Sequence, residues 1–252
     1  MELFLDHFYA GIDAKSFDEY SILGELIPGT EVRTTSSGDL TWSGVYPRSS
    51  SGVYMELIKR TGELQKAGLS LAFSGLGYEE NIEENLRKQF PEIHWISNEV
   101  HLDGKEPWFW IVKPSDQEQE PRVWTWAMEF LGNQREKRRK RIGQENTPIE
   151  SFVSMEMRFP PDLIDQMHNK WHQWVPGTRS LENGKYIVQI LCYQSHDFTL
   201  VGTADPQIEL PEVQRIVAKL KAGRSVQEYR GKSFRVFTSG GELIFEFLGQ
   251  TI

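Results

Sequence analysis

The sequence contains a single cysteine, Cys192, among its 252 residues. One cysteine cannot form an intramolecular disulfide bond or a cysteine-rich zinc site, and the apolar neighbours of Cys192 are typical of a small buried residue. Long apolar runs are absent too, because none approaches the roughly 18 residues that a membrane-spanning helix requires. The N-terminal residues lack the basic start and long apolar centre of a secretory signal. We therefore expect a cytoplasmic protein that does not span a membrane.

Positive charge is also in short supply, since 28 lysines and arginines stand against 36 aspartates and glutamates, which gives a net charge of −8. This balance argues against extended binding to the phosphates of nucleic acid. The sequence has no Gly-x-Ser-x-Gly elbow of a serine hydrolase. Gly231-Lys232-Ser233 is not a phosphate loop, because Val226 stands where the first glycine is required. The partner we expect is a small molecule, and the chain could act alone or as a homodimer.

The composition is that of an ordinary globular protein, with 38% hydrophobic, 25% charged and 12% aromatic residues. The length suits one large domain or two units of about 120 residues. The most charged region includes the basic run 135–141, which has no interleaved aromatic residues and therefore favours a solvated, mobile connector over an RNA-binding segment. We accordingly divide the chain into a first unit at 1–132, a connector at 133–150 and a second unit at 151–252.

The first 60 residues follow the order strand, helix and three strands. Residues 4–12 favour a strand, and Asp13 can cap a helix that begins directly after it. The segment 31–46 reads as a hairpin, and the apolar stretch 53–59 closes the unit as its fourth strand. The pattern predicts a compact βαβββ module.

The rest of the chain is predicted to contain further strands and three further helices. Two of these helices lie at 82–90 and 161–171, the second after a strand at 152–159, as at the N-terminus. The third, at 211–221, is predicted as an inserted helix before two final strands at 233–238 and 242–248.

A weak internal repeat links the two halves. Placing 53–58 over 243–248 aligns Glu56 with Glu246. At each of the remaining positions an apolar or aromatic residue lies opposite another. Repeats of this kind indicate architecture, although any apolar strand could imitate one this short.

His7 on a first strand before a short helix, and Glu56 on the fourth strand of a βαβββ module, resemble the vicinal oxygen chelate superfamily of glyoxalase I, extradiol dioxygenases and bleomycin-resistance proteins. The runs 7–13, 31–35 and 54–57 are similar to those of glyoxalase-like proteins. The resemblance implies an α+β fold in which paired βαβββ modules form a curved mixed sheet around a small-molecule pocket, with inserted helices.

The same resemblance implies a divalent metal ion held by His7, Glu56 and Glu246. Such an ion would act as a Lewis acid on adjacent substrate oxygens in an isomerase, lyase or dioxygenase reaction, with Glu129 moving a proton. The first strand of the second half carries no histidine for a fourth ligand, which leaves three candidates: Ser154, Glu156 and Glu129.

Two further functions remain open from the sequence. The lack of a clear fourth ligand favours a metal-free protein that binds or sequesters a small molecule, in which His7 would be a hydrogen-bonded strand residue. A partner-binding module that uses the aromatic stretches 107–112 and 123–130 is the third alternative.

Overall fold

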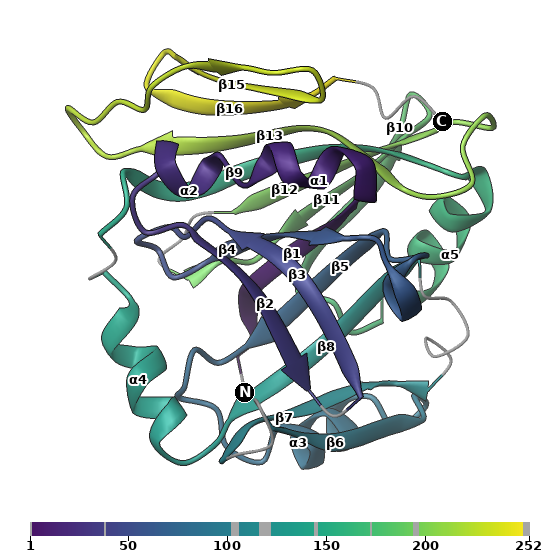
Figure 1. The fold of residues 1–252 in the computed structure, drawn as a ribbon. Coiled ribbons are helices and arrows are strands. Elements are labelled where there is room, and N and C mark those ends of the chain that lie inside the picture. The colour runs from purple at the N-terminus through teal and green to yellow at the C-terminus, as the bar shows by residue number, and fades with distance from the viewer. Residues whose placement is uncertain are drawn as a thin grey trace.

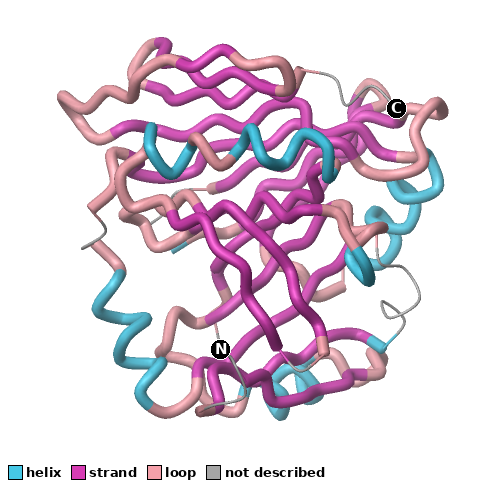
Figure 2. The backbone as a smooth tube through the Cα atoms, in the orientation of Figure 1, coloured by secondary structure: helices cyan, strands magenta, loops and turns pink. Residues whose placement is uncertain are grey.

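The computed structural model describes seven stretches of the chain: residues 2–37, 39–101, 106–115, 122–143, 146–171, 173–193 and 197–248. These residues form two eight-stranded mixed sheets accompanied by short helices, and strands dominate the backbone (Figures 1 and 2). The expected α+β fold with curved mixed sheets is confirmed. No helix in the described stretches is long and apolar enough to cross a membrane.

The first sheet has the strand order β2-β3-β4-β1-β5-β8-β7-β6. Its strands are β1 (Phe4–Ile12), β2 (Glu31–Ser37), β3 (Leu40–Tyr46), β4 (Tyr54–Lys59), β5 (Leu69–Ser74), β6 (Trp95–His101), β7 (Pro107–Pro114) and β8 (Val123–Phe130). The short helices between them are α1 (Ala14–Tyr20), α2 (Leu23–Leu26), the 3₁₀ turn η1 (Gly62–Leu64) and α3 (Ile82–Gln89). The order βαβββ thus occurs twice, and in each unit the first and fourth strands are parallel neighbours.

The second sheet repeats this order as β10-β11-β12-β9-β13-β16-β15-β14. Its elements are β9 (Ile149–Phe159), α5 (Pro161–Trp171), β10 (Gly177–Glu182), β11 (Lys185–Ile190), β12 (Phe198–Ala204), β13 (Glu212–Leu220), β14 (Tyr229–Arg230), β15 (Phe234–Ser239) and β16 (Glu242–Phe247). Each half of the chain therefore holds two four-strand units, whereas the sequence predicted one unit with an extension in the first half.

The fourth unit differs from the other three because no helix separates β13 from β14. A helical crossover lets a later strand run parallel to the first, while direct turns reverse the chain at each step. As a result β16 is antiparallel to β13, whereas β4 is parallel to β1.

The predicted helix at 211–221 is wrong, because this segment forms β13 in the middle of the second sheet, between β9 and β16. The pairing of β13 with β9 shifts register at three places. Each shift breaks the two-residue alternation of a strand, so that Val213, Ile216, Val217 and Leu220 are buried at a spacing that imitates a helix.

The hydrophobic core lies between the two sheets. Phe8 on β1 stacks on Phe198 of β12 at a centroid distance of 4.7 Å and meets Phe152 of β9 edge-on at 5.3 Å. Tyr20 of α1 stacks on Phe234 of β15, which places this helix against the second sheet (Figure 1). Because the core covers one face of the first sheet, the opposite face of β1 and β4 is left for a site.

The segment between the sheets is more ordered than a solvated connector. It contains α4 (Asn133–Arg141), which lies beside the first sheet (Figure 1). Arg138 in this helix is only 5% exposed, because its guanidinium group reaches the buried Asp6 on β1.

Candidate functional site

The candidate site begins with the alternation of β1. Phe8, Ala10 and Ile12 join the core, so His7 and Tyr9 point to the opposite face. The register of β1 with β5 shifts between Leu5 and His7, and bulges of this kind re-aim neighbouring side chains. His7 and Asp6 are consecutive residues, yet their side chains meet, with His7 Nδ1 3.1 Å from Asp6 Oδ1.

Asp6 is fully buried and is held by three side chains. Its Oδ2 accepts hydrogen bonds from Ser74 Oγ at 2.7 Å and from Arg138 Nε at 3.0 Å. Burial raises the pKa of Asp6, but Arg138 and the hydrogen bonds from His7 and Ser74 lower it by more. The pKa of Asp6 therefore lies well below its ordinary value. The carboxylate is therefore ionised and can only accept, so Nδ1 of His7 carries the proton and Nε2 faces away from Asp6.

Glu56 is the residue that His7 faces. In the parallel pair β1–β4, His7 lies opposite Tyr54, and Tyr9 lies opposite Glu56. The His7 Nε2 to Glu56 Oε1 distance is 4.0 Å, and the Glu56 side chain is 15% exposed. Burial raises the pKa of Glu56 above its ordinary value, although His7, Arg33 and Arg48 oppose this rise. A carboxyl group with a raised pKa beside an imidazole can exchange a proton with a bound molecule.

Aromatic rings surround this pair. The Tyr54 ring stacks on the His7 ring at 4.6 Å, and the Trp126 ring meets it edge-on at 5.7 Å. Burial and the negative charge of Glu56 raise the pKa of Tyr54 well above its ordinary value, which keeps its hydroxyl group protonated. The Tyr9 and Ser70 hydroxyls lie close together on the same face, but neither has a partner at hydrogen-bond geometry in the described part of the chain.

The remaining predicted metal ligands lie in the second sheet. Glu246 is on β16, where Arg235 binds its carboxylate from the neighbouring strand. Ser154 and Glu156 are on β9, and the exposed Glu156 lies 4.0 Å from Arg215. The alignment of Glu56 with Glu246 compared strands of similar composition that belong to different sheets, so the structure does not bring the predicted set of three ligands together.

Glu129, the predicted proton carrier, has a different environment. Trp126 approaches His7, and Glu129 three residues later points to the other face of β8. Its Oε2 accepts the Ile82 amide of the first turn of α3 at 3.0 Å, and its Oε1 is bound by Arg135. Both oxygens thus join α3 and α4 to β8, away from His7.

A divalent metal ion does not fit the donors present at His7 and Glu56. These two supply one nitrogen and one carboxylate, and no group of three or more His, Cys, Asp or Glu side chains is gathered in the described residues. The second unit of the first sheet contributes Ser70, Ala72 and Trp126 to this face, and none of these is a strong metal ligand. Arginines that act on Glu56 add positive charge, which further disfavours a cation.

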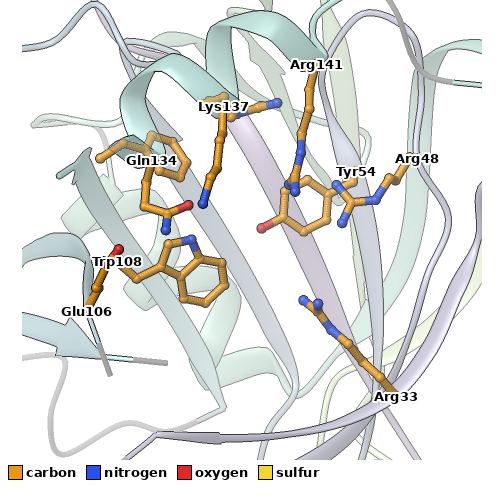
Figure 3. A pocket seen from close by; sticks show the side chains of 10 residues that line it. Arg33, Arg48, Tyr54, Glu106, Trp108, Gln134, Lys137 and Arg141 are labelled. Atoms are coloured by element: carbon orange, nitrogen blue, oxygen red, sulfur yellow. The ribbon is translucent and has the colours of Figure 1, made fainter. Parts of the chain in front are cut away.

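A cavity near this face has a volume of about 490 Å³ and a cationic lining. Its walls come from β2, the turn before β4, β7, the end of β8 and α4, and they carry ten residues: Arg33, Arg48, Tyr54, Glu106, Trp108, Phe130, Gln134, Lys137, Arg138 and Arg141. Figure 3 shows Lys137 and Arg141 directed from the helix into the cavity, Arg141 toward Tyr54 and Lys137 toward Trp108, with Arg33 on the opposite side. Tyr54 belongs to the cavity and also covers His7, so it joins the two parts of the site.

The cavity-lining face of α4 is a signal that the sequence analysis missed. Gln134, Lys137, Arg138 and Arg141 follow the spacing i, i+3, i+4, i+7, which places them on one side of a helix. The neighbouring Lys140 instead pairs with Glu136 on the exposed side. The composition of the charged run favours a solvated connector, whereas its periodicity distinguishes the two sides of a helix.

Comparisons with known proteins give a weak similarity of fold and no match of sequence. No protein-family model matches the chain, and no curated protein matches its sequence. Among solved structures, the chain is similar to a crystal structure of BphC, described as a halotolerant catechol dioxygenase. The TM-score is 0.44 and the identity is 6%, over 87% of this chain and 72% of that one. A likeness at this level assigns no activity.

Proposed function

We propose that this protein binds a small molecule at the open face of its first sheet and that a divalent metal ion takes no part in the binding. The observation that carries the proposal is the cavity of about 490 Å³, whose walls combine aromatic rings with converging cations. Ligand sites commonly have volumes of about 300–1,000 Å³ and place a few polar groups among apolar ones.

The environment of His7 supports a metal-free site. Metal-bound histidines often donate their second nitrogen to a carboxylate, and Asp6 does accept such a bond from His7. The remaining coordination sphere, however, would be left to Glu56 alone. The same Asp6–His7 bond equally fixes the imidazole so that Nε2 can accept a hydrogen bond from a ligand. We therefore assign His7 and Glu56 to ligand contact or proton exchange.

Tyr54 connects the cavity to this pair, because it lines the cavity and stacks on His7, whereas His7 and Glu56 are not among the lining residues. Its ring lies between the cavity and His7, and the Arg48 guanidinium is 5.3 Å from the centre of that ring. A ligand in the cavity would meet the Tyr54 hydroxyl first, which can donate a hydrogen bond because it stays protonated.

The test combines elemental analysis with thermal unfolding. The purified protein is incubated with Fe²⁺, Mn²⁺ or Zn²⁺, desalted and analysed for metal, alongside the variant His7→Ala/Glu56→Gln and the matched control Glu246→Gln. We expect less than a tenth of an equivalent in all three proteins. In a second step, protein treated with EDTA is screened against small carboxylates, phosphates and neutral compounds, and we expect at least one to raise Tm.

Two results would overturn the proposal. One is near-stoichiometric metal in the unmodified protein and in Glu246→Gln that disappears in His7→Ala/Glu56→Gln. The other is a Tm shift by a ligand that EDTA abolishes and added metal restores.

A further inference from the structure

The charge of the cavity can be counted from its lining and from the ion pairs of that lining. Five cations line it: Arg33, Arg48, Lys137, Arg138 and Arg141. Glu31 pairs with Arg33 at 3.0 Å and with Arg48 at 3.1 Å, while Asp6 pairs with Arg138. With Glu106, which lines the cavity, three carboxylates stand against five cations among the described residues, so the lining has an excess of positive charge. This excess stands out in a chain whose net charge is −8.

Lys137 and Arg141 account for the excess. Neither has a carboxylate partner within ion-pair distance among the described residues, although carboxylates outnumber cations in the chain. Both point from α4 into the cavity, Arg141 toward Tyr54 and Lys137 toward Trp108 (Figure 3). Arg138 between them is tied to Asp6 and to the Gly52 carbonyl, which it reaches at 2.6 Å, so the helix is anchored with its two unpaired cations over the cavity.

The other side of the cavity is aromatic. Trp108 on β7 and Phe130 at the end of β8 line it, and Figure 3 shows the Trp108 indole facing the cavity beside Gln134. Indole and phenyl faces bind flat apolar groups well. Arg141 therefore lies at the Tyr54 end of the cavity, whereas Lys137, Gln134 and Glu106 lie beside the flat Trp108 indole (Figure 3).

We propose that the ligand of this cavity is a dianionic small molecule that carries its charge on an aromatic or similarly flat group, such as an aryl phosphate monoester or an aromatic dicarboxylate. This inference rests on the proposed small-molecule function and names its ligand class. The dianion lies between α4 and β2, where Lys137 and Arg141 neutralise it and Arg33 faces it from the opposite wall. The flat group lies against Trp108, and the Tyr54 hydroxyl donates a hydrogen bond to the ligand.

The experiment is isothermal titration calorimetry at pH 8 with EDTA present. The probes are phenyl phosphate, phthalate, benzoate and benzyl alcohol. Phenyl phosphate is a dianion at this pH because the second pKa of a phosphate monoester is about 6. We expect phenyl phosphate or phthalate to bind at least tenfold more tightly than benzoate, and benzyl alcohol to bind more weakly still. Tighter binding of phenyl phosphate would identify a phosphate as the group that carries the charge of the ligand, and tighter binding of phthalate would identify a pair of carboxylates.

The variants locate the binding on α4. Lys137→Gln/Arg141→Gln removes the two unpaired cations, and Lys140→Gln removes one charge from the exposed side of the same helix. Each charge-assisted hydrogen bond that is lost weakens binding about tenfold. We expect a loss of at least tenfold in the double variant and less than twofold in Lys140→Gln. Unchanged Tm values for both variants show that neither has lost its fold.

Three outcomes overturn the inference. Tighter binding of benzoate or benzyl alcohol than of either dianion would overturn the ligand class while leaving the proposed small-molecule function intact. Equal losses in the double variant and in Lys140→Gln would show a general charge effect. Failure of all four probes to bind the folded protein would overturn the dianion assignment, whereas the metal analysis and the thermal screen together decide the proposed function separately.

Discussion

Replacing Arg138 with glutamine should destabilise the protein more than any other single charge change in α4. Arg138 is 5% exposed and Asp6 is fully buried, and the two are linked by guanidinium contacts of 2.9 and 3.0 Å. Removing one partner of a buried pair leaves an uncompensated charge, which costs about 3–5 kcal/mol. The lost bond to the Gly52 carbonyl adds to this cost. A loss of this size is a large share of the roughly 5–15 kcal/mol that stabilises a typical domain.

Urea unfolding followed by circular dichroism measures this loss for Arg138→Gln, Asp6→Asn and the double variant, with Lys140→Gln as the exposed control. The double variant should be more stable than the sum of the two single losses indicates, because no buried charge is left alone. The pH dependence has a definite sign. Asp6 has a lowered pKa, so its stabilising effect is present above the ordinary pKa of aspartate and is lost as pH falls toward the folded value.

Without Arg138 the pKa of Asp6 should rise, so the deficit of Arg138→Gln relative to the unmodified protein should shrink as the pH is lowered from 7 toward 4. A loss below about 1 kcal/mol at pH 7, or a deficit that grows on acidification, would refute the assigned ion pair. Either result would also contradict the anchoring of α4 to the first sheet through Arg138, on which the position of the α4 cations in the cavity depends.

Glu56→Gln should stabilise the folded protein at neutral pH. The pKa of Glu56 is raised, so its ionisation lowers the free energy of unfolding as the pH rises through the pKa of the folded state. Urea unfolding at pH 4 and pH 8 should show the gain in stability only at pH 8. Phe8→Ala should cost about 3–5 kcal/mol, because Phe8 packs against Phe152 and Phe198 between the sheets, and a loss below about 1 kcal/mol would contradict that packing. Treatment with EDTA should leave Tm unchanged, and a fall in Tm that Zn²⁺ or Fe²⁺ reverses would contradict the metal-free site.

The prediction of the first βαβββ module succeeded because its signals are local. The cap at Asp13 binds the amides of Lys15 and Ser16, as its position before the helix indicated. Alternation from His7 onward on β1 and along β4 sends His7 and Glu56 to the same face, and the module order makes these strands neighbours. The pairing of His7 with Glu56 could therefore be anticipated from the sequence.

The site residues that the sequence did not identify depend on contacts between distant segments. Asp6 and Arg138 are 132 positions apart, and nothing in either neighbourhood indicates that they meet. The assignment of Glu246 failed for a related reason, since a six-residue pattern does not show which sheet a strand joins. The register shifts of β13 likewise come from its pairing with β9 and not from its own residues.

The sequence by itself determined the α+β class, the first module and the face that carries His7 and Glu56, because strand alternation and helix caps act over a few residues. Only the tertiary structure decided that each half holds two units, that Glu246 belongs to the other sheet and that α4 turns its cations toward the cavity. These features depend on which strands pair and on the contact between the buried Arg138 and Asp6. Such choices are set by the packing of the whole chain.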